Sequence, residues 1–240
     1  MNPQYTESYL NEFYSTYQEL DGLNIRYGDK IRPRELIHGY NLEQIEKYSK
    51  REKFLSVGCG NGLDIKVAKE RGWIAEGYEV DENHARELSD RLETQIHSGD
   101  FSKMNGNEEY SCIYMNHVLE HPKRPGEYLS TVRRLLKPDG IMYIACPNID
   151  SVSNRIKNML EGLGLRKEIG KHYDTWHHLF YYSPTKLKKL LEKHYGFEVL
   201  YYGNDKKGTR DTTEVIHSFL DDWPYKSSFR LIARKIKKAI

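Results

Sequence analysis

Residues 54–62 read Phe-Leu-Ser-Val-Gly-Cys-Gly-Asn-Gly, and this stretch decides the fold. Its first four residues are mostly apolar and lack helical spacing, which is typical of a buried parallel strand. Gly58, Gly60 and Gly62 then end the run, and glycine both adopts positive φ and lets a ligand approach the backbone closely. Residues 63–71 have helical apolar spacing. Strand, glycine turn and helix N-terminus together predict a nucleotide-type cradle with free N–H groups facing a ligand.

The spacing of the glycines separates two classes of cofactor. A dinucleotide-binding turn has the pattern G-x-G-x-x-G, which would require a glycine where this chain has Leu63. The chain has G-x-G-x-G instead, and this disfavours a nicotinamide-dependent oxidoreductase. On this motif alone, a plain strand–helix turn without a ligand remains an alternative.

Composition limits the classes of function. The chain has 240 residues and a net charge of +2, with a pI of about 8.2 and a mean hydropathy of −0.78. We therefore expect one domain with additions, or at most two small ones, and no bulk electrostatic attraction to nucleic acid. The three cysteines lack metal-cluster spacing and are predicted to be reduced, buried thiols of a cytoplasmic protein. No signal peptide and no membrane span are expected.

Strands and helices are predicted to alternate along most of the chain. The expected strands are residues 54–57, 73–80, 94–97, 110–115, 140–146 and 197–202. Residues 137–140, Lys-Pro-Asp-Gly, read as a turn by composition. Residues 229–236 fit either a final antiparallel strand or an amphipathic helix, whose basic residues would be solvated or would contact a membrane surface or polyanion.

Two helices are predicted before the first strand. The first lies within residues 3–20. The second has its apolar stripe at residues 36–48 and Pro33 as its first helical residue. We divide the chain into an N-terminal helical cover or lid (1–50), a cofactor-binding core (51–148), a substrate-side insertion (149–182) and a C-terminal part of the sheet with a tail (183–240).

Motifs beyond the glycine turn carry a family resemblance. They are Asn-His-Val-Leu-Glu-His-Pro at 116–122, Leu-Leu-Lys-Pro-Asp-Gly at 135–140, Pro-Asn at 147–148 and His-Leu-Phe-Tyr-Tyr-Ser-Pro at 178–184. With the G-x-G-x-G turn, these motifs make residues 50–200 resemble the class I S-adenosylmethionine (SAM)-dependent methyltransferases, in particular the small-molecule, UbiG-like branch. The resemblance implies a Rossmann-like, doubly wound, mostly parallel seven-stranded sheet of order 3-2-1-4-5-7-6. It also implies SAM as cofactor and S-adenosylhomocysteine (SAH) as product.

The resemblance implies roles for two acidic residues at strand ends. Glu79 matches the carboxylate that binds both ribose hydroxyls, and its distance of about 20 residues from the glycine turn agrees with that role. Asp100 matches the acid that meets the adenine amino group, although an aspartate at this place is as often a turn residue or helix cap. The chain departs from the family at Ser56, where an acid is usual. The predicted cofactor residues are Gly58, Cys59, Gly60, Asn61, Gly62, Glu79, Val80, Asp100, Phe101, Asn116 and His117.

Histidine is suited to remove the proton of an alcohol acceptor near neutral pH. The candidate bases are His121, His178 and His117, each of which could instead be structural. Predicted substrate residues are Tyr173, Trp176, His177, His178 and Asn148. Glu120 and His121 could help hold a divalent metal, as in the related quinone O-methyltransferases, but a pair offers too few ligands, so no metal is predicted.

The predicted function is O-directed methyl transfer to a small molecule or a sugar or polysaccharide precursor, and a homodimer is the candidate assembly. The alternatives are a nucleic-acid or N-directed methyltransferase and a non-catalytic SAM-binding protein. All the proposed cofactor groups follow predicted strand ends, and parallel strands bring their carboxyl ends to one edge. The hypothesis therefore requires Glu79 and Asp100 to lie at the glycine corner.

Overall fold

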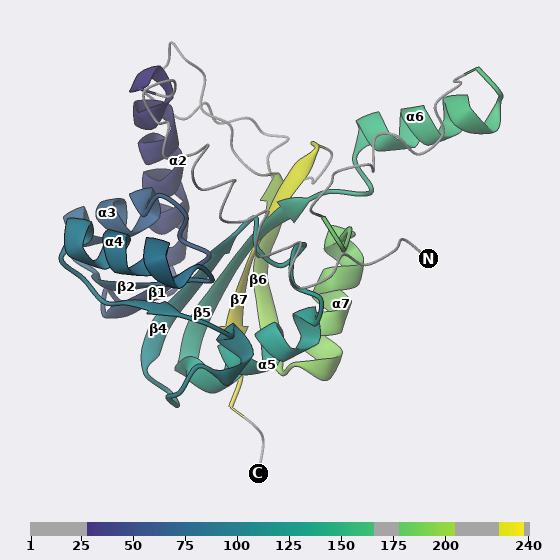
Figure 1. Ribbon diagram of the computed structural model, residues 1–240. Helices are drawn as coiled ribbons and strands as arrows, with labels where there is room; N and C mark the ends of the chain where they lie inside the picture. Colours follow the sequence, from purple (N-terminus) through teal and green to yellow (C-terminus); the bar gives the residue numbers. More distant parts are fainter. Residues whose placement is uncertain (1–27, 166–177, 205–225, 238–240) are drawn as a thin grey trace.

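The computed structural model describes residues 28–165, 178–204 and 226–237. These residues form a seven-stranded sheet of order β3-β2-β1-β4-β5-β7-β6 (Figure 1). The strands are β1 (Lys53–Val57), β2 (Ile74–Glu79), β3 (Ile96–Ser98), β4 (Tyr110–Asn116), β5 (Leu136–Pro147), β6 (Phe197–Asn204) and β7 (Ser228–Lys235). The helices are α2 (Gly28–Glu46), α3 (Leu63–Glu70), α4 (Glu82–Leu92), α5 (Pro125–Leu135), α6 (Val152–Gly162) and α7 (Pro184–His194), with a 3₁₀ turn, η2 (Phe101–Lys103).

Strands β1 to β5 are parallel to one another, and β7 is antiparallel to both of its neighbours. The central strand β1 contains Phe54 and Leu55, both with 0% of their surface exposed. A parallel strand covered on both faces favours such an uninterrupted apolar sequence. The predicted fold class, including the strand order, is therefore confirmed.

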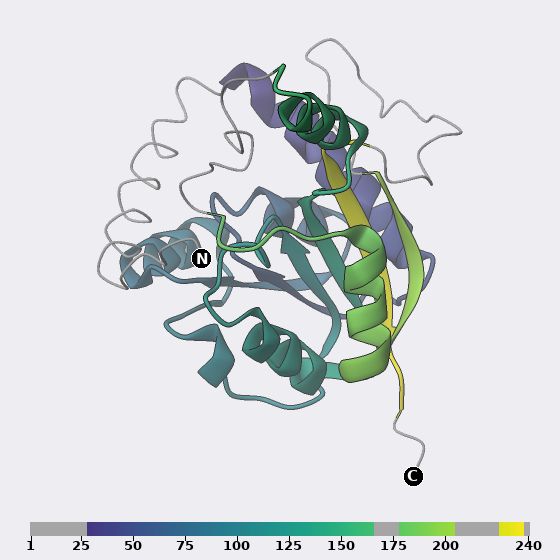
Figure 2. The same cartoon turned by 90° about the vertical axis from the view of Figure 1, so that its right-hand side faces the viewer.

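Helices cover both faces of the sheet (Figures 1 and 2), and each face has its own apolar core. On one face, Leu129 and Val132 of α5 and Leu187 of α7 pack on the strands. On the other face, Leu42 of α2 and Ile65 of α3 do the same. The Rossmann-like three-layer arrangement follows, because each helix buries one apolar stripe against the sheet.

Several boundaries differ from the sequence predictions. Helix α2 begins at Gly28, so Pro33 lies inside the helix and is not its first residue. This is possible because the fixed φ of proline is close to the helical value, at the loss of one backbone hydrogen bond. The predicted turn at residues 137–140 lies within β5, where the register against β4 shifts and Asp139 has a φ of 64°. The third strand is Ile96–Ser98, two residues later than its expected start.

The ambiguous C-terminal stretch is a strand. Strand β7 pairs with β5 from Ile141↔Arg234 to Pro147↔Ser228, and with β6 on its other side. The helical alternative is therefore wrong, because only a strand supplies the hydrogen bonds that two neighbouring strands need. Within the described ranges, no helix is both long and apolar enough to cross a membrane. The first predicted helix, residues 3–20, lies outside the described residues.

Candidate functional site

The glycine turn between β1 and α3 has the conformation that its sequence predicts. Gly58, Gly60 and Gly62 have φ values of 65°, 51° and 74°. A Cβ at Gly58 would come within 2.9 Å of Val118, and one at Gly62 would collide with Leu92. A Cβ at Gly60 would meet nothing within 4 Å. Gly60 is therefore the position at which the turn leaves open space for a ligand.

Most of the turn's amide groups are already hydrogen-bonded, which corrects one expectation. Gly58 and Cys59 both donate to the carbonyl of Tyr78, at 2.8 and 3.2 Å, and Gly62 donates to the carbonyl of Cys59. The amide of Gly60 donates to Glu79 at 3.1 Å. The turn is held by its own hydrogen bonds, so it offers a ligand mainly shape and the carboxylate of Glu79.

Glu79 ends β2 beside the turn, as the hypothesis requires. It is 5% exposed, and its two carboxylate oxygens accept from the amides of Gly60 and Val80 at 3.1 and 2.8 Å. Burial raises the pKa of Glu79, although these amides and the charge of His84 oppose the shift. A carboxylate held in this way can accept further bonds from a pair of vicinal hydroxyls. Its neighbour Val80 is exposed, with an apolar side chain beside the same edge.

Asp100 follows β3 at the same edge of the sheet. Its carboxylate caps η2, accepting from the amide of Ser102 at 3.0 Å and from its hydroxyl at 2.7 Å. These bonds hold the pKa of Asp100 below its usual value. The side chain is 48% exposed, whereas Phe101 is fully buried against the rings of Tyr78 and Tyr128. Asp100 acts as a cap here, and contact of either residue with adenine stays a prediction.

Glu120 lies at the centre of a group of histidines beyond β4. Its side chain is 0% exposed, and one oxygen lies 3.3 Å from Nδ1 of His117 and 4.0 Å from Nε2 of His178. The rings of His178 and His121 meet edge to face, with 5.0 Å between their centroids. Burial alone would raise the pKa of Glu120, but the hydrogen bond from His117 and the charges of His121 and His117 outweigh it, so its pKa is lowered. Glu120 is thus a buried, ionised carboxylate close to three imidazole rings.

The three candidate bases reach this group from two separate parts of the chain. His117 has a φ of 57°, an uncommon conformation for a residue other than glycine and one that occurs at functional sites. The segment with His178 is fastened to the same loop, because Leu179 and Phe180 donate their amides to the carbonyl of Glu120 at 2.9 and 3.1 Å. His121 and His178 are 57 residues apart in the chain, and backbone hydrogen bonds hold both ends of their contact: His121 donates to the carbonyl of Val118, and Leu179 donates to that of Glu120.

The side chain of Asn148 has a structural role, because it is hydrogen-bonded to two backbone groups. Its side-chain amide donates to the carbonyl of Lys226 at 3.1 Å, and its side-chain oxygen accepts from the amide of Asp150 at 2.9 Å. It is 1% exposed, and its contact with a substrate stays a prediction. Asn116 ends β4 and is half-buried. The other predicted substrate residues, Tyr173, Trp176 and His177, lie outside the described residues.

Sequence reasoning passed over two further side chains at this edge. His84 of α4 contacts the carbonyl of Gly60 at 2.7 Å, and its place one turn into the helix after Glu79 was the available signal. Asp64, 7% exposed at the start of α3, accepts a hydrogen bond from Ser56. An acid is thus present beside Ser56 although it comes from another element, and burial raises its pKa.

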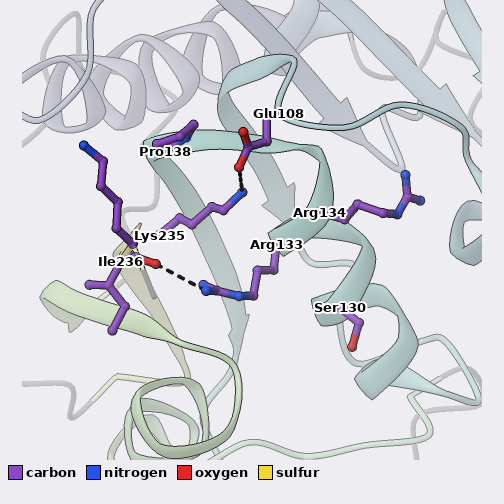
Figure 3. A pocket seen from close by; sticks show the side chains of 8 residues that line it. Glu108, Ser130, Arg133, Arg134, Pro138, Lys235 and Ile236 are labelled. Carbon is purple, nitrogen blue, oxygen red and sulfur yellow. Dashed lines mark hydrogen bonds and ion pairs between the residues drawn. The ribbon is translucent and has the colours of Figure 1, made fainter. Parts of the chain in front are cut away.

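A different cleft, of about 470 Å³, lies between the end of α5 and the end of β7 (Figure 3). Its basic side chains are occupied by the protein itself. Lys235 contacts Glu108 at 3.0 Å and the carbonyl of Leu136 at 2.6 Å, and Arg133 donates to the carbonyl of Ile236 at 3.2 Å (Figure 3). This cleft lies at the amino ends of the parallel strands, and it fastens β7 to the rest of the fold.

The fold is that of an α/β protein with a nucleotide-type turn at the carboxyl edge of its sheet, and comparison with known proteins agrees with this class. The family model described as "Methyltransferase domain" matches residues 29–202. A SAM-dependent methyltransferase of Archaeoglobus fulgidus has a TM-score of 0.60 at 20% identity, covering 84% of this chain and 94% of that one. The magnesium protoporphyrin IX methyltransferase of Synechocystis PCC 6803, with bound SAH, has a TM-score of 0.66 at 14% identity, covering 96% and 100%.

The chain belongs to the methyltransferase domain family, and SAM is the cofactor of this class I fold. A ubiquinone biosynthesis O-methyltransferase of Caulobacter vibrioides is 29% identical over 101 residues, covering 39% of this chain and 40% of the relative. One of Dinoroseobacter shibae is 26% identical over 200 residues, covering 75% and 77%. For the first of these relatives the match thus spans less than half of its length.

Proposed function

We propose that this protein transfers the methyl group of SAM to a hydroxyl of a small molecule, with a histidine of the Glu120 group as general base. The observation that carries the proposal is the buried carboxylate of Glu120, with His117 at 3.3 Å and His178 at 4.0 Å. The related O-methyltransferases named for ubiquinone biosynthesis favour a phenolic hydroxyl. A sugar hydroxyl is the alternative acceptor.

In the reaction, a lone pair of the acceptor oxygen attacks the methyl carbon of the sulfonium. The carbon–sulfur bond breaks, SAH leaves as a neutral thioether, and the hydroxyl proton passes to an imidazole nitrogen. Because the leaving group is already good, the protein mainly aligns the two reactants and takes the proton. Glu120 stabilises the imidazolium that forms, in the way that a buried carboxylate supports a catalytic histidine.

The base is proposed to be His121, with His178 as the next candidate. Both are partly exposed, whereas Glu120 is fully buried. His117 forms the hydrogen bond to Glu120 and is better placed to orient that carboxylate. Removing a general base lowers turnover about 10²–10⁴-fold.

The test compares His121→Asn, His178→Asn and Glu120→Gln with a control, His194→Asn, at an exposed position of α7. Release of SAH is measured with a panel of phenols, catechols and sugars. We expect kcat to fall at least about 100-fold in His121→Asn, while the affinity for SAH stays within about twofold of the original. If His121→Asn and His178→Asn both keep the turnover of the control, neither histidine is the base.

A second mechanism is favoured by one specific observation. Ligand atoms of Glu120, His121 and His178 lie within 4.8 Å of one another, a set that fits a divalent cation. His178 supplies the third ligand that the Glu120–His121 pair lacks. A cation held by these residues would polarise the acceptor oxygen and lower the pKa of its hydroxyl. Dialysis against EDTA separates the two mechanisms, because activity of the histidine-base enzyme survives it and metal-assisted activity is lost until Mg²⁺ or Zn²⁺ is restored.

A further inference from the structure

Arg230 is a buried cation at the same edge of the sheet, and the proposed mechanism does not use it. It is the third residue of β7, and only 1% of its surface is exposed. Its guanidinium lies 4.5 Å from the ring centre of Tyr40 and 5.2 Å from that of Tyr201. One nitrogen, Nη2, donates to the hydroxyls of these tyrosines at 2.7 and 3.2 Å.

The other two nitrogens of the guanidinium have no partner. Nε and Nη1 of Arg230 are buried and make no hydrogen bond. Among the described residues, no carboxylate forms an ion pair with Arg230. Burial opposes its charge, yet the tyrosines around it raise its pKa, so it stays protonated. A buried charge with unfilled donors is costly unless an anion joins it.

The sheet neighbours of Arg230 have small side chains. Across the sheet it pairs with Ala145 of β5 and Gly203 of β6, two of the smallest residues. On the covering layer, Tyr40 of α2 presents its ring, and the adjacent Asn41 has a buried side-chain oxygen without a donor. The orphan groups therefore gather between α2 and the β5–β7–β6 part of the sheet.

This place lies beyond the reach of the carboxylate of SAM. Glu79 ends β2, and four strand spacings separate β2 from β7, which is roughly 19 Å at about 4.8 Å per strand. From the ribose to the carboxylate, an extended SAM spans roughly 9 Å, since its bonds are about 1.5 Å long. The methyl acceptor is therefore the better source of an anion.

The acceptor's reactive end would lie close by. Glu120 is 3.4 Å from the thiol of Cys146, the residue of β5 that pairs with Phe229, immediately before Arg230. Cys146 and Arg230 belong to opposite faces of the sheet, but both lie near the end of β5, since Arg230 pairs with Ala145 and β5 ends at Pro147. A molecule lying across this edge could therefore meet the histidine group with one end and Arg230 with the other.

We propose that Arg230 binds a carboxylate or phosphate group of the methyl acceptor, so that the acceptor is an anionic hydroxyl compound. The proposal rests on the proposed function, because it names the acceptor's chemical class. Nε and Nη1 form the two parallel donors that suit a carboxylate or a phosphate oxygen pair. The two tyrosines hold the guanidinium in place for this contact.

The test measures binding without turnover, so that it is independent of which group acts as base. The full chain, saturated with SAH, is titrated calorimetrically with benzoate, phenyl phosphate and the neutral benzyl alcohol. We expect benzoate or phenyl phosphate to bind, and Arg230→Gln to weaken that binding at least about tenfold. Benzyl alcohol should bind equally to both proteins. Arg234→Gln, which removes a partly exposed arginine of the same strand that pairs with Glu198, serves as the matched control and should retain most of the affinity.

A second measurement does not depend on whether the Arg230→Gln variant folds. In the unsubstituted protein labelled with ¹⁵N-arginine, the Nε–H resonance of Arg230 should shift with the anionic probe and not with benzyl alcohol. The relative response to benzoate and to phenyl phosphate identifies the anion. The proposal is overturned if neither anion binds or if the Arg230 resonance is unmoved. It is overturned equally if Arg230→Gln weakens the binding of SAH tenfold and leaves the binding of the anionic probes unaffected. The carboxylate of the cofactor would then be the partner of Arg230. Loss of turnover in His121→Asn has no bearing on any of these outcomes.

Discussion

Replacing Gly60 by valine tests the cofactor site most directly. A side chain at this position has no protein atom within 4 Å of its Cβ, so its bulk enters the open space over the turn, where the cofactor is expected. Two costs are involved. The positive φ of 51° strains any residue with a Cβ, by about 1–2 kcal/mol. The second cost falls only on the bound state, because valine and cofactor would compete for one space.

Gly72 provides the matched control for the first of these costs. It also has positive φ, 89°, and open space around its Cβ, but it lies after α3 at the other end of that helix. Gly72→Val should therefore lose similar stability in urea unfolding and bind SAH normally. In isothermal calorimetry, Gly60→Val should bind SAH at least about 100-fold more weakly, or about 2.8 kcal/mol. If Gly60→Val bound SAH within threefold of Gly72→Val, the reasoning about the turn would be refuted.

Two further predictions concern stability and reactivity. The carboxylate of Glu76, bonded to His97, Tyr110 and Lys53, has its pKa lowered from 4.5 to about 2 although burial opposes this. The stabilisation of the folded protein by this carboxylate is therefore complete above pH 4.5 and is lost as pH falls toward 2. Glu76→Gln should lower the urea midpoint of unfolding at pH 7 and lower it much less near pH 3. An equal loss at both pH values would contradict this reasoning. All three cysteines are free and buried. A thiol reagent should therefore label none of them rapidly in the native protein and all three in urea. Fast labelling of the native protein would show that the thiols are accessible and would contradict their burial.

Most of the fold could be predicted because its signals are local. The apolar run at β1, the three glycines after it and the helical spacing of α3 are contiguous in the chain, and each agrees with the structure. The failures occur where distant partners decide. Residues 137–140 have a turn composition, yet β4 pairs with Leu136 and Ile141 on either side of them, so these four residues form an irregularity within β5. The C-terminal stretch was ambiguous by itself, and pairing with β5 and β6 makes it a strand.

The candidate site was predictable to a similar extent and for the same reason. The position of Glu79 follows from its distance to the glycine turn, and its bond to the amide of Gly60 bears out their proximity. The bonds that occupy the amides of Gly58 and Cys59 could not be predicted, because their acceptor is the carbonyl of Tyr78 on the neighbouring strand. The contact of His178 with His121 likewise depends on backbone bonds to Glu120 from a segment far along the chain.

Arg230 shows how a local signal can be present and still be missed. The strand reads Ser-Phe-Arg-Leu-Ile-Ala, and an arginine in an apolar run of a strand buried on both faces needs a compensating group. In this chain the aromatic rings of Tyr40 and Tyr201 and two hydroxyls meet only part of that need, since two of its nitrogens remain without acceptors. Because stability alone would favour an apolar residue at this position, the retention of a charge there is better explained by a ligand than by the fold. The same argument applies to Glu120, another fully buried charge at this edge, whose partners are the histidines of the proposed reaction.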